Sequence, residues 1–246
     1  MSETTVVLVH GAFADASSWN GVITRLQAED VPVTAPPNPL RGIAADSAYM
    51  ASVLDQIDSP VLAVGHSYGG AVITNAATDA KNVVGLVYVA AFAPDEGELL
   101  GAVEAGSKDS VLNDALVPRR YPTADGGSAT EFSIDPAKTR NAFAGDLSEE
   151  QAALIAATQR PVSELAFSDP SGPPAWKDRP SWAVVATGDR AAGTDVVRSM
   201  AERAGAKITE IEGSHVIMVS QPQAVTDVIL EALATVGSRS EAVLSS

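Results

Sequence analysis

A serine stands between glycines in residues 61–71, which read V-L-A-V-G-H-S-Y-G-G-A. The pattern G-x-S-x-G, preceded by an apolar run and followed by small residues, is typical of a sharp turn that joins a strand to a helix. The glycines let strand and helix approach closely, so that the hydroxyl of Ser67 is exposed at the tip of the turn. This serine could attack a carbonyl carbon, and the N–H of Tyr68 at the helix start would face the developing oxyanion.

A serine nucleophile needs a base, and the chain contains only three histidines. His66 lies inside the serine turn, where its side chain points the wrong way to take the serine proton. His10 follows the first predicted strand, in the loop expected to supply a second oxyanion donor. His215 remains, in a Gly-Ser-His sequence between the last predicted strand and the last predicted helix. We therefore predict that His215 is the base.

A third group must orient the imidazole and stabilise its charged form. Asp189 follows the apolar run V-V-A-T, at the carboxyl end of a predicted strand, and His215 is expected at the same edge of the sheet. Asp195 is the nearest alternative, but it should lie in the first turn of a helix, where a carboxylate is explained as a cap. The sequence predicts a triad of Ser67, Asp189 and His215, in that chain order.

Strands and helices alternate around these residues. Continuous apolar runs predict strands that are buried on both faces, and amphipathic stretches between them predict helices. The expected strands cover 6–9, 31–35, 61–64, 83–90, 182–187 and 207–211, and the expected helices 18–29, 46–57, 69–78, 194–204 and 223–236. This alternation predicts an α/β fold with a mainly parallel sheet of about six strands and helices on both faces. Residues 237–246 are expected to fray.

The alternation stops between residues 98 and 178, where the sequence shows no strong strand. Ala-rich amphipathic pieces alternate there with stretches rich in Gly, Pro and Asp. We expect a mainly helical cap, inserted into an α/β core that consists of residues 1–97 and 179–246. The substrate pocket should lie between this cap and the serine turn. Phe13, Tyr68 and Phe92 are candidates for its walls.

Composition narrows the possible functions. A net charge of −15 disfavours a nucleic-acid partner and an anionic substrate. The chain has no cysteine, which excludes disulfides, thiolate metal sites and a cysteine nucleophile. The apolar run at residues 6–9 is too short for a signal sequence or a membrane span, so we expect a cytoplasmic protein without a membrane partner. We expect no metal or organic cofactor, and a monomer or weak homodimer.

Together these motifs resemble the α/β-hydrolases, and within them the compact branch of plant methyl-ester hydrolases, hydroxynitrile lyases and bacterial serine esterases. The likeness rests on L-V-H-G-A-F (8–13), G-H-S-Y-G-G (65–70), T-G-D (187–189) and G-S-H (213–215), and it does not extend to the cap. It implies an oxyanion hole formed by the backbone N–H of Ala12 or Phe13 together with that of Tyr68. It also implies a serine esterase that cleaves small to medium carboxylic esters through an acyl-enzyme.

Two positions depart from the lyases of that branch. There, a threonine follows the strand-end histidine and a lysine follows the catalytic histidine, whereas this chain has Gly11 and Val216. Glycine has no hydroxyl to hold a cyanohydrin oxygen, and valine cannot stabilise departing cyanide, so a lyase is disfavoured. The relatives that displace halide or open epoxides carry aspartate at the turn, and Ser67 argues against both. Two alternatives remain open: the same triad could serve lactone or amide hydrolysis or cofactor-free perhydrolysis of the haloperoxidase type, or the protein could be a slow-turnover receptor for a small ligand.

Overall fold

A six-stranded sheet forms the centre of the protein, for which the computed structural model describes residues 3–244. The strands lie in the order β2-β1-β3-β4-β8-β9, and every neighbouring pair is parallel. The strands are β1 (Thr5–Val9), β2 (Val33–Thr34), β3 (Val61–His66), β4 (Val83–Val89), β8 (Ser181–Ala186) and β9 (Lys207–Ile211). The predicted α/β fold with a parallel sheet of about six strands is therefore confirmed.

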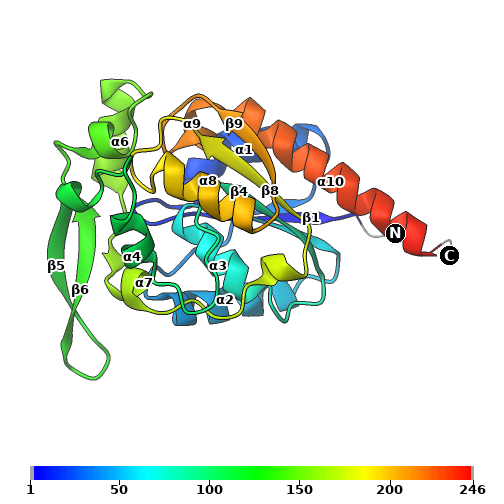
Figure 1. Ribbon diagram of the computed structural model, residues 1–246, viewed down its shortest axis with the longest axis horizontal. Helices are drawn as coiled ribbons and strands as arrows, with labels where there is room; N and C mark the ends of the chain where they lie inside the picture. Colours follow the sequence, from blue (N-terminus) through cyan, green and yellow to red (C-terminus); the bar gives the residue numbers. More distant parts are fainter. Residues whose placement is uncertain (1–2, 245–246) are drawn as a thin grey trace.

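Helices cover the sheet, which explains the continuous apolar runs of its strands: β3 and β8 are buried along their whole length. The helices of the core are α1 (Asn20–Ala28), α2 (Ile43–Asp55), α3 (Tyr68–Ala76), α8 (Thr194–Arg203), α9 (Ile217–Ser220) and α10 (Pro222–Leu244), with a short 3₁₀-helix at Ala16–Trp19. Helix α1 packs against α10, and α2 packs against α3 (Figure 1).

The last helix is longer than its sequence pattern indicated. We expected it to end at Val236 and the chain to fray beyond, but α10 continues to Leu244. An apolar stripe predicts only the part of a helix that packs on the core. Four of the seven residues after Gly237 (Arg239, Glu241, Ala242 and Leu244) are good helix formers, which favours continuation of the helix. Residues 245–246 lie outside the described part of the chain.

Most of the cap, residues 98–178, lies at one end of the sheet, at the left of Figure 1 in green, and its last residues run back along the core beside α3. It contains helices, as expected, but also a separate antiparallel sheet in the order β5-β6-β7. The expectation that this segment has no strong strand is therefore wrong. The cap elements are α4 (Leu100–Ala105), β5 (Leu116–Pro122), β6 (Ser128–Ile134), α5 (Thr139–Ala142), α6 (Glu149–Thr158), β7 (Val162–Ser163) and α7 (Leu165–Ser168), with 3₁₀-helices at Asn113–Ala115 and Ala175–Lys177.

The hairpin formed by β5 and β6 gave no strong signal because neither strand has a continuous apolar face. Every residue of β5 is exposed or only half-buried, and the strand contains Pro118 and Pro122. The one local signal was its turn, Asp125-Gly126-Gly127, in which Gly126 has a φ of +83°. An Asp-Gly pair between two short β-prone runs is a known hairpin signature.

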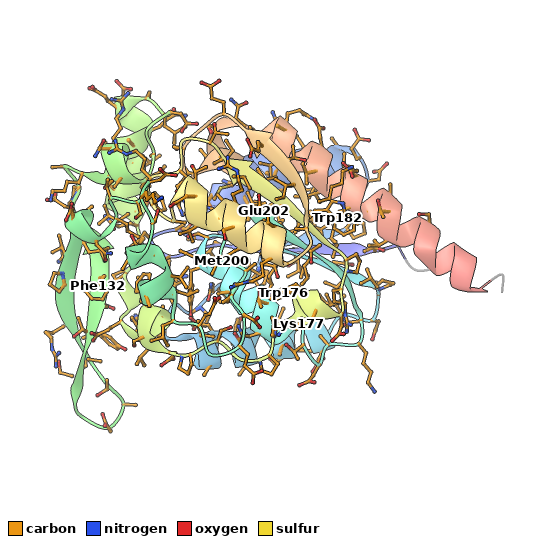
Figure 2. All side chains as sticks on the ribbon, viewed as in Figure 1. Phe132, Trp176, Lys177, Trp182, Met200 and Glu202 are labelled. Carbon is orange, nitrogen blue, oxygen red and sulfur yellow. The ribbon has the colours of Figure 1, made fainter. Side chains whose placement is uncertain are left out.

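Both ends of the cap are fastened to the core at one place. The indole Nε1 of Trp176 donates to the carbonyl oxygen of Pro94 at 3.0 Å, and Lys177 Nζ pairs with Asp95 Oδ1 at 2.6 Å. The Lys177 ammonium also lies 5.4 Å from the centroid of the Trp176 ring (Figure 2). The chain therefore leaves the core after β4 and returns to it at neighbouring points, as an inserted cap would require.

Candidate active site

The serine turn has the geometry that its glycines predict. Ser67 lies between β3 and α3 with a φ of 53° and a ψ of −125°, which is a strained conformation for a residue that carries a side chain. A Cβ on Gly65 would lie 2.5 Å from the carbonyl oxygen of Gly69, and a Cβ on Gly69 would lie 2.4 Å from that of Val9. Because only glycine fits at these two positions, strand and helix can meet closely enough to present the serine between them.

Asp189 and His215 meet at the carboxyl ends of β8 and β9. His215 Nδ1 lies 2.8 Å from Asp189 Oδ2, and each side chain is only 1% exposed. The second carboxylate oxygen of Asp189 accepts the backbone N–H groups of Ala191 at 2.9 Å and Ala192 at 3.0 Å. Since the carboxylate can only accept, Nδ1 of His215 carries the proton in this pair. The other ring nitrogen, Nε2, is then the one available as a base.

Asp195, the alternative acid, is engaged elsewhere. It lies in the first turn of α8, where its carboxylate accepts a hydrogen bond from the Ser107 hydroxyl at 2.5 Å and one from the backbone N–H of Lys108 at 2.9 Å. These contacts connect α8 to the cap. The structure brings Asp189 and not Asp195 to the histidine.

Ser67 and His215 lie in chain segments that touch through His66. His66 Nε2 donates to the carbonyl oxygen of His215 at 3.0 Å, and the two imidazole centroids are 4.7 Å apart. Within residues 3–244, however, no hydrogen bond joins the Ser67 hydroxyl to the His215 ring. Such catalytic hydrogen bonds are often long until substrate binds. The structure thus places the two segments together, while the direct contact stays a prediction.

The other two histidines support the site from within the core. His10 Nε2 accepts the backbone N–H of Asn38 at 3.0 Å, and its Nδ1 donates to the Gly11 carbonyl at 2.9 Å. Burial lowers the pKa of His10, and it lowers the pKa of His66 well below the ordinary histidine value. Both rings are therefore neutral in the folded protein near pH 7.

These two neutral histidines make the stability depend on pH. Below the ordinary histidine pKa of 6.5 the unfolded chain protonates both rings while the folded chain does not. The free energy of unfolding should therefore fall as the pH drops from 6.5, by up to about 1.4 kcal/mol per pH unit for each histidine. Urea unfolding of the wild type and of His10→Asn between pH 7.5 and 5.5 measures this slope. The variant should show the weaker dependence, and equal slopes would contradict the assignment.

The loop after β1 runs directly against the serine. A Cβ on Gly11 would lie 2.6 Å from Ser67 Cβ, and Phe13 is held at a φ of +60°. In the part of the chain that the structure describes, the backbone N–H groups of Ala12, Phe13 and Tyr68 donate to no protein acceptor. Three free donors beside the serine form an arrangement that could bind a carbonyl oxygen as it becomes negative.

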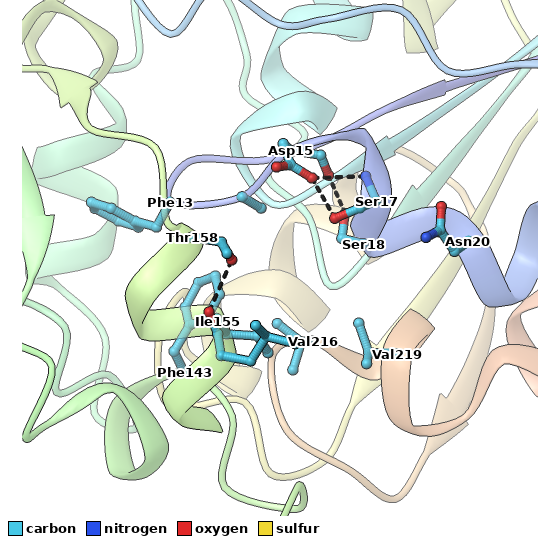
Figure 3. A pocket seen from close by; sticks show the side chains of 12 residues that line it. Phe13, Asp15, Ser17, Ser18, Asn20, Phe143, Ile155, Thr158, Val216 and Val219 are labelled. Carbon is cyan, nitrogen blue, oxygen red and sulfur yellow. Dashed lines mark hydrogen bonds between the residues drawn. The ribbon is translucent and has the colours of Figure 1, made fainter. Parts of the chain in front are cut away.

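A cavity of about 240 Å³ opens beside this loop (Figure 3). One wall is polar and comes from the 3₁₀-helix and the start of α1, and the opposite wall is largely apolar and comes from the cap and from the segment after His215. The polar side consists of Asp15, Ser17, Ser18 and Asn20, and the remaining lining of Phe13, Ala14, Phe143, Leu154, Ile155, Thr158, Val216 and Val219.

Phe143 lines this cavity and also contacts His215, whereas Ser67, Asp189 and His215 are not among the lining residues. Its ring meets that of Phe13 edge-on at 6.2 Å, and its centroid lies 5.0 Å from that of His215. Sequence reasoning missed Phe143, because a single aromatic residue in an Ala-rich stretch gives no sign of the direction in which it points. Of the three candidate wall residues, Phe13 lines the cavity, whereas Tyr68 and Phe92 do not.

Tyr68 has a different set of contacts. Its phenol hydroxyl donates to Asp46 Oδ2 at 2.7 Å, and the same carboxylate accepts the backbone N–H of Arg41. Burial raises the pKa of Asp46 and raises that of Tyr68 well above its ordinary value. The side chain of Tyr68 therefore anchors α3 to α2, and only its backbone N–H faces the site.

Residues 3–244 contain no group of three or more His, Asp or Glu side chains arranged to hold a metal ion. Across the same residues, no helix has both the length and the apolar character needed to span a bilayer.

The fold and the site together define a class. The parallel sheet carries a serine on a strand-to-helix turn, and a buried His–Asp pair follows the two later strands β8 and β9. This is the architecture of α/β-hydrolases. The chain belongs to the alpha/beta hydrolase family, whose family model matches residues 6–228. No curated protein sequence matches the chain.

Several solved structures share this fold. A pyrethroid hydrolase from Sphingobium faniae matches with a TM-score of 0.76 at 19% identity, over 95% of this chain and 98% of that one. Polyneuridine aldehyde esterase matches with a TM-score of 0.77 at 21% identity, over 94% of this chain and 99% of that one. A methylesterase from Arabidopsis matches with a TM-score of 0.77 at 20% identity, again over 94% and 99%.

Proposed function

We propose that the protein is a serine esterase that hydrolyses small to medium, uncharged carboxylic esters through an acyl-enzyme. The observation that carries this proposal is the buried Asp189–His215 pair, 2.8 Å apart, whose histidine lies in a loop that touches the strained serine turn. In this assignment Ser67 is the nucleophile, His215 the base and Asp189 the group that orients it.

Each step then has a group to perform it. His215 Nε2 takes the proton of Ser67 while the serine oxygen attacks the ester carbonyl carbon. The resulting oxyanion is held by the N–H of Tyr68 and by that of Ala12 or Phe13. The protonated imidazole gives its proton to the departing alcohol, which leaves the acyl group on the serine. Water, deprotonated by the same imidazole, attacks the acyl-enzyme and releases the acid, and the proton returns to the serine.

The cavity and the overall charge support an uncharged ester. Phe143, Ile155 and Val216 offer an apolar wall to an acyl or alkyl group, with hydroxyls opposite. The carboxylate of Asp15 at the cavity and the net charge of −15 both disfavour an anionic substrate. The three fold neighbours described above are named a hydrolase, an esterase and a methylesterase, which agrees with ester cleavage.

Two measurements test the proposal together. The wild-type protein should turn over p-nitrophenyl acetate, butyrate and octanoate, and the chain-length profile sizes the cavity. A fluorophosphonate should label one site, which peptide mass mapping should identify as Ser67. A protein that is inert towards esters yet gains thermal stability with a small ligand would favour the receptor alternative. If the protein turned over lactones or amides, or used peroxide in place of water, faster than it hydrolysed these esters, the lactonase, amidase or perhydrolase alternative would be favoured.

A further inference from the structure

The proposed base lies in a short loop, residues 213–216, which we call the base loop. Three core contacts hold it: the N–H of Gly188 donates to the Gly213 carbonyl at 2.9 Å, His66 donates to the His215 carbonyl, and Asp189 accepts from the His215 ring. The cap adds a second set of contacts from the other side. These come from residues 143–146, the segment after α5, which we call the roof segment.

Two side chains of the roof segment touch the base loop. The Phe143 ring packs on the His215 imidazole at an angle of 54°, and Asp146 Oδ1 accepts a hydrogen bond from the Ser214 hydroxyl. The second oxygen of Asp146, Oδ2, lies against Gly213 of the same loop: a Cβ added to Gly213 would be only 2.7 Å from it. The Asp146 carboxylate is thus seated against the loop, one residue before the base.

The Asp146–Ser214 contact joins a residue of the cap surface, whose carboxylate is partly covered by this contact, to the buried Ser214. Partial burial alone would raise the pKa of Asp146, but hydrogen bonds from the side chain and the backbone of Ser214 contribute to a pKa below the ordinary value. Asp146 is therefore ionised at neutral pH. Hydrogen bonds to an ionised acceptor are stronger and shorter than those between neutral groups.

We propose that Asp146 is a positioning residue, which acts through Ser214 to hold the base loop and so makes the reactivity of His215 depend on the seating of the cap. This inference rests on the proposed role of His215 as the base. A displacement of about 1 Å between catalytic groups can cost on the order of a hundredfold in rate. The Asp146 carboxylate binds Ser214, the residue directly before His215, and can therefore prevent such a displacement of the base.

Kinetics on p-nitrophenyl butyrate tests the coupling. Asp146→Ala and Ser214→Ala should each lower kcat by about tenfold to a hundredfold with little change in KM. The double variant should lose no more than either single variant, and Asp146→Asn, which retains an acceptor oxygen, should recover most of the rate. The matched control is Asp125→Ala, which removes a cap carboxylate that accepts from Thr123 and Gly127 in the β5–β6 turn. Additive losses, or no rescue by asparagine, would overturn the proposal.

A readout that does not depend on activity separates this inference from the proposed function. With only three histidines, ¹⁵N-histidine labelling gives one set of imidazole signals for each ring. In Asp146→Ala the His215 signals should shift or broaden, while those of His10, bound within the core to Asn38, stay in place. Unchanged His215 signals would refute the positioning role even if the esterase assignment holds. If the wild type does not hydrolyse esters, the esterase proposal fails, and changed His215 signals in Asp146→Ala would then show only that Asp146 holds the base loop.

Discussion

Replacing Ser67 by alanine should lower kcat for p-nitrophenyl ester hydrolysis by about four to six decades, and His215→Ala should have a similar effect. Without the hydroxyl there is no acyl-enzyme, and without the imidazole the hydroxyl keeps its proton. The two losses should not add in the double variant, because the residues act as one unit. A residual rate above that of water would come from the oxyanion donors and substrate binding.

The strained serine turn makes it necessary to check that the Ser67→Ala variant is still folded. Alanine keeps the Cβ at Ser67, so the backbone conformation at a φ of 53° carries the same strain in the variant as in the wild type. Thermal unfolding should therefore change little while activity disappears. Ser52→Ala, on the exposed side of α2, serves as a serine removed far from the site. Retention of more than about one percent activity in Ser67→Ala would rule this serine out as the nucleophile.

Asp189→Asn should cost about four decades in kcat. The carboxylate accepts from His215 Nδ1 with one oxygen and from the N–H groups of Ala191 and Ala192 with the other. An asparagine that keeps the two backbone contacts must turn its NH₂ group towards Nδ1. The ring would then carry its proton on Nε2, where it could no longer accept the serine proton.

Asp195→Asn is the matched control for that variant. Its carboxylate also accepts from a hydroxyl and a backbone N–H, but these belong to Ser107 and Lys108 of the cap and not to the histidine. We expect its kcat to stay within a few-fold of the wild type, which steady-state kinetics on both variants would check. If Asp195→Asn were the inactive variant and Asp189→Asn the active one, the identity of the acid would be reversed.

The core could be predicted because its signals are local. Strands buried on both faces read as continuous apolar runs, and β9 was predicted at its observed bounds, 207–211. The scarcity of histidines and the position of Asp189 after a buried strand were enough to propose a triad. Its two later members are in contact in the structure.

The cap could not be predicted to the same depth, for a physical reason. The β5–β6 hairpin is stabilised by strand pairing and by side chains such as Arg120, whose guanidinium bonds Ser128 and Thr130 across the ladder. Such contacts leave no periodic pattern. The roles of Phe143 and Asp146 arise only because the cap folds back onto the base loop, and nothing in their own neighbourhood indicates that partner. The cytoplasmic location and the monomer or weak homodimer stay predictions.

The pairing of β4 with β8 has a consequence for how the chain reaches its fold. Val87 lies beside Trp182, although the whole cap comes between them in the sequence. Closing so long a loop adds little to the free-energy cost of folding but slows the search. During synthesis, the first four strands would emerge with β4 as an open apolar edge, ready to pair with any other strand. Only the arrival of β8 closes that edge, which makes the time needed to synthesise the cap the interval of greatest aggregation risk.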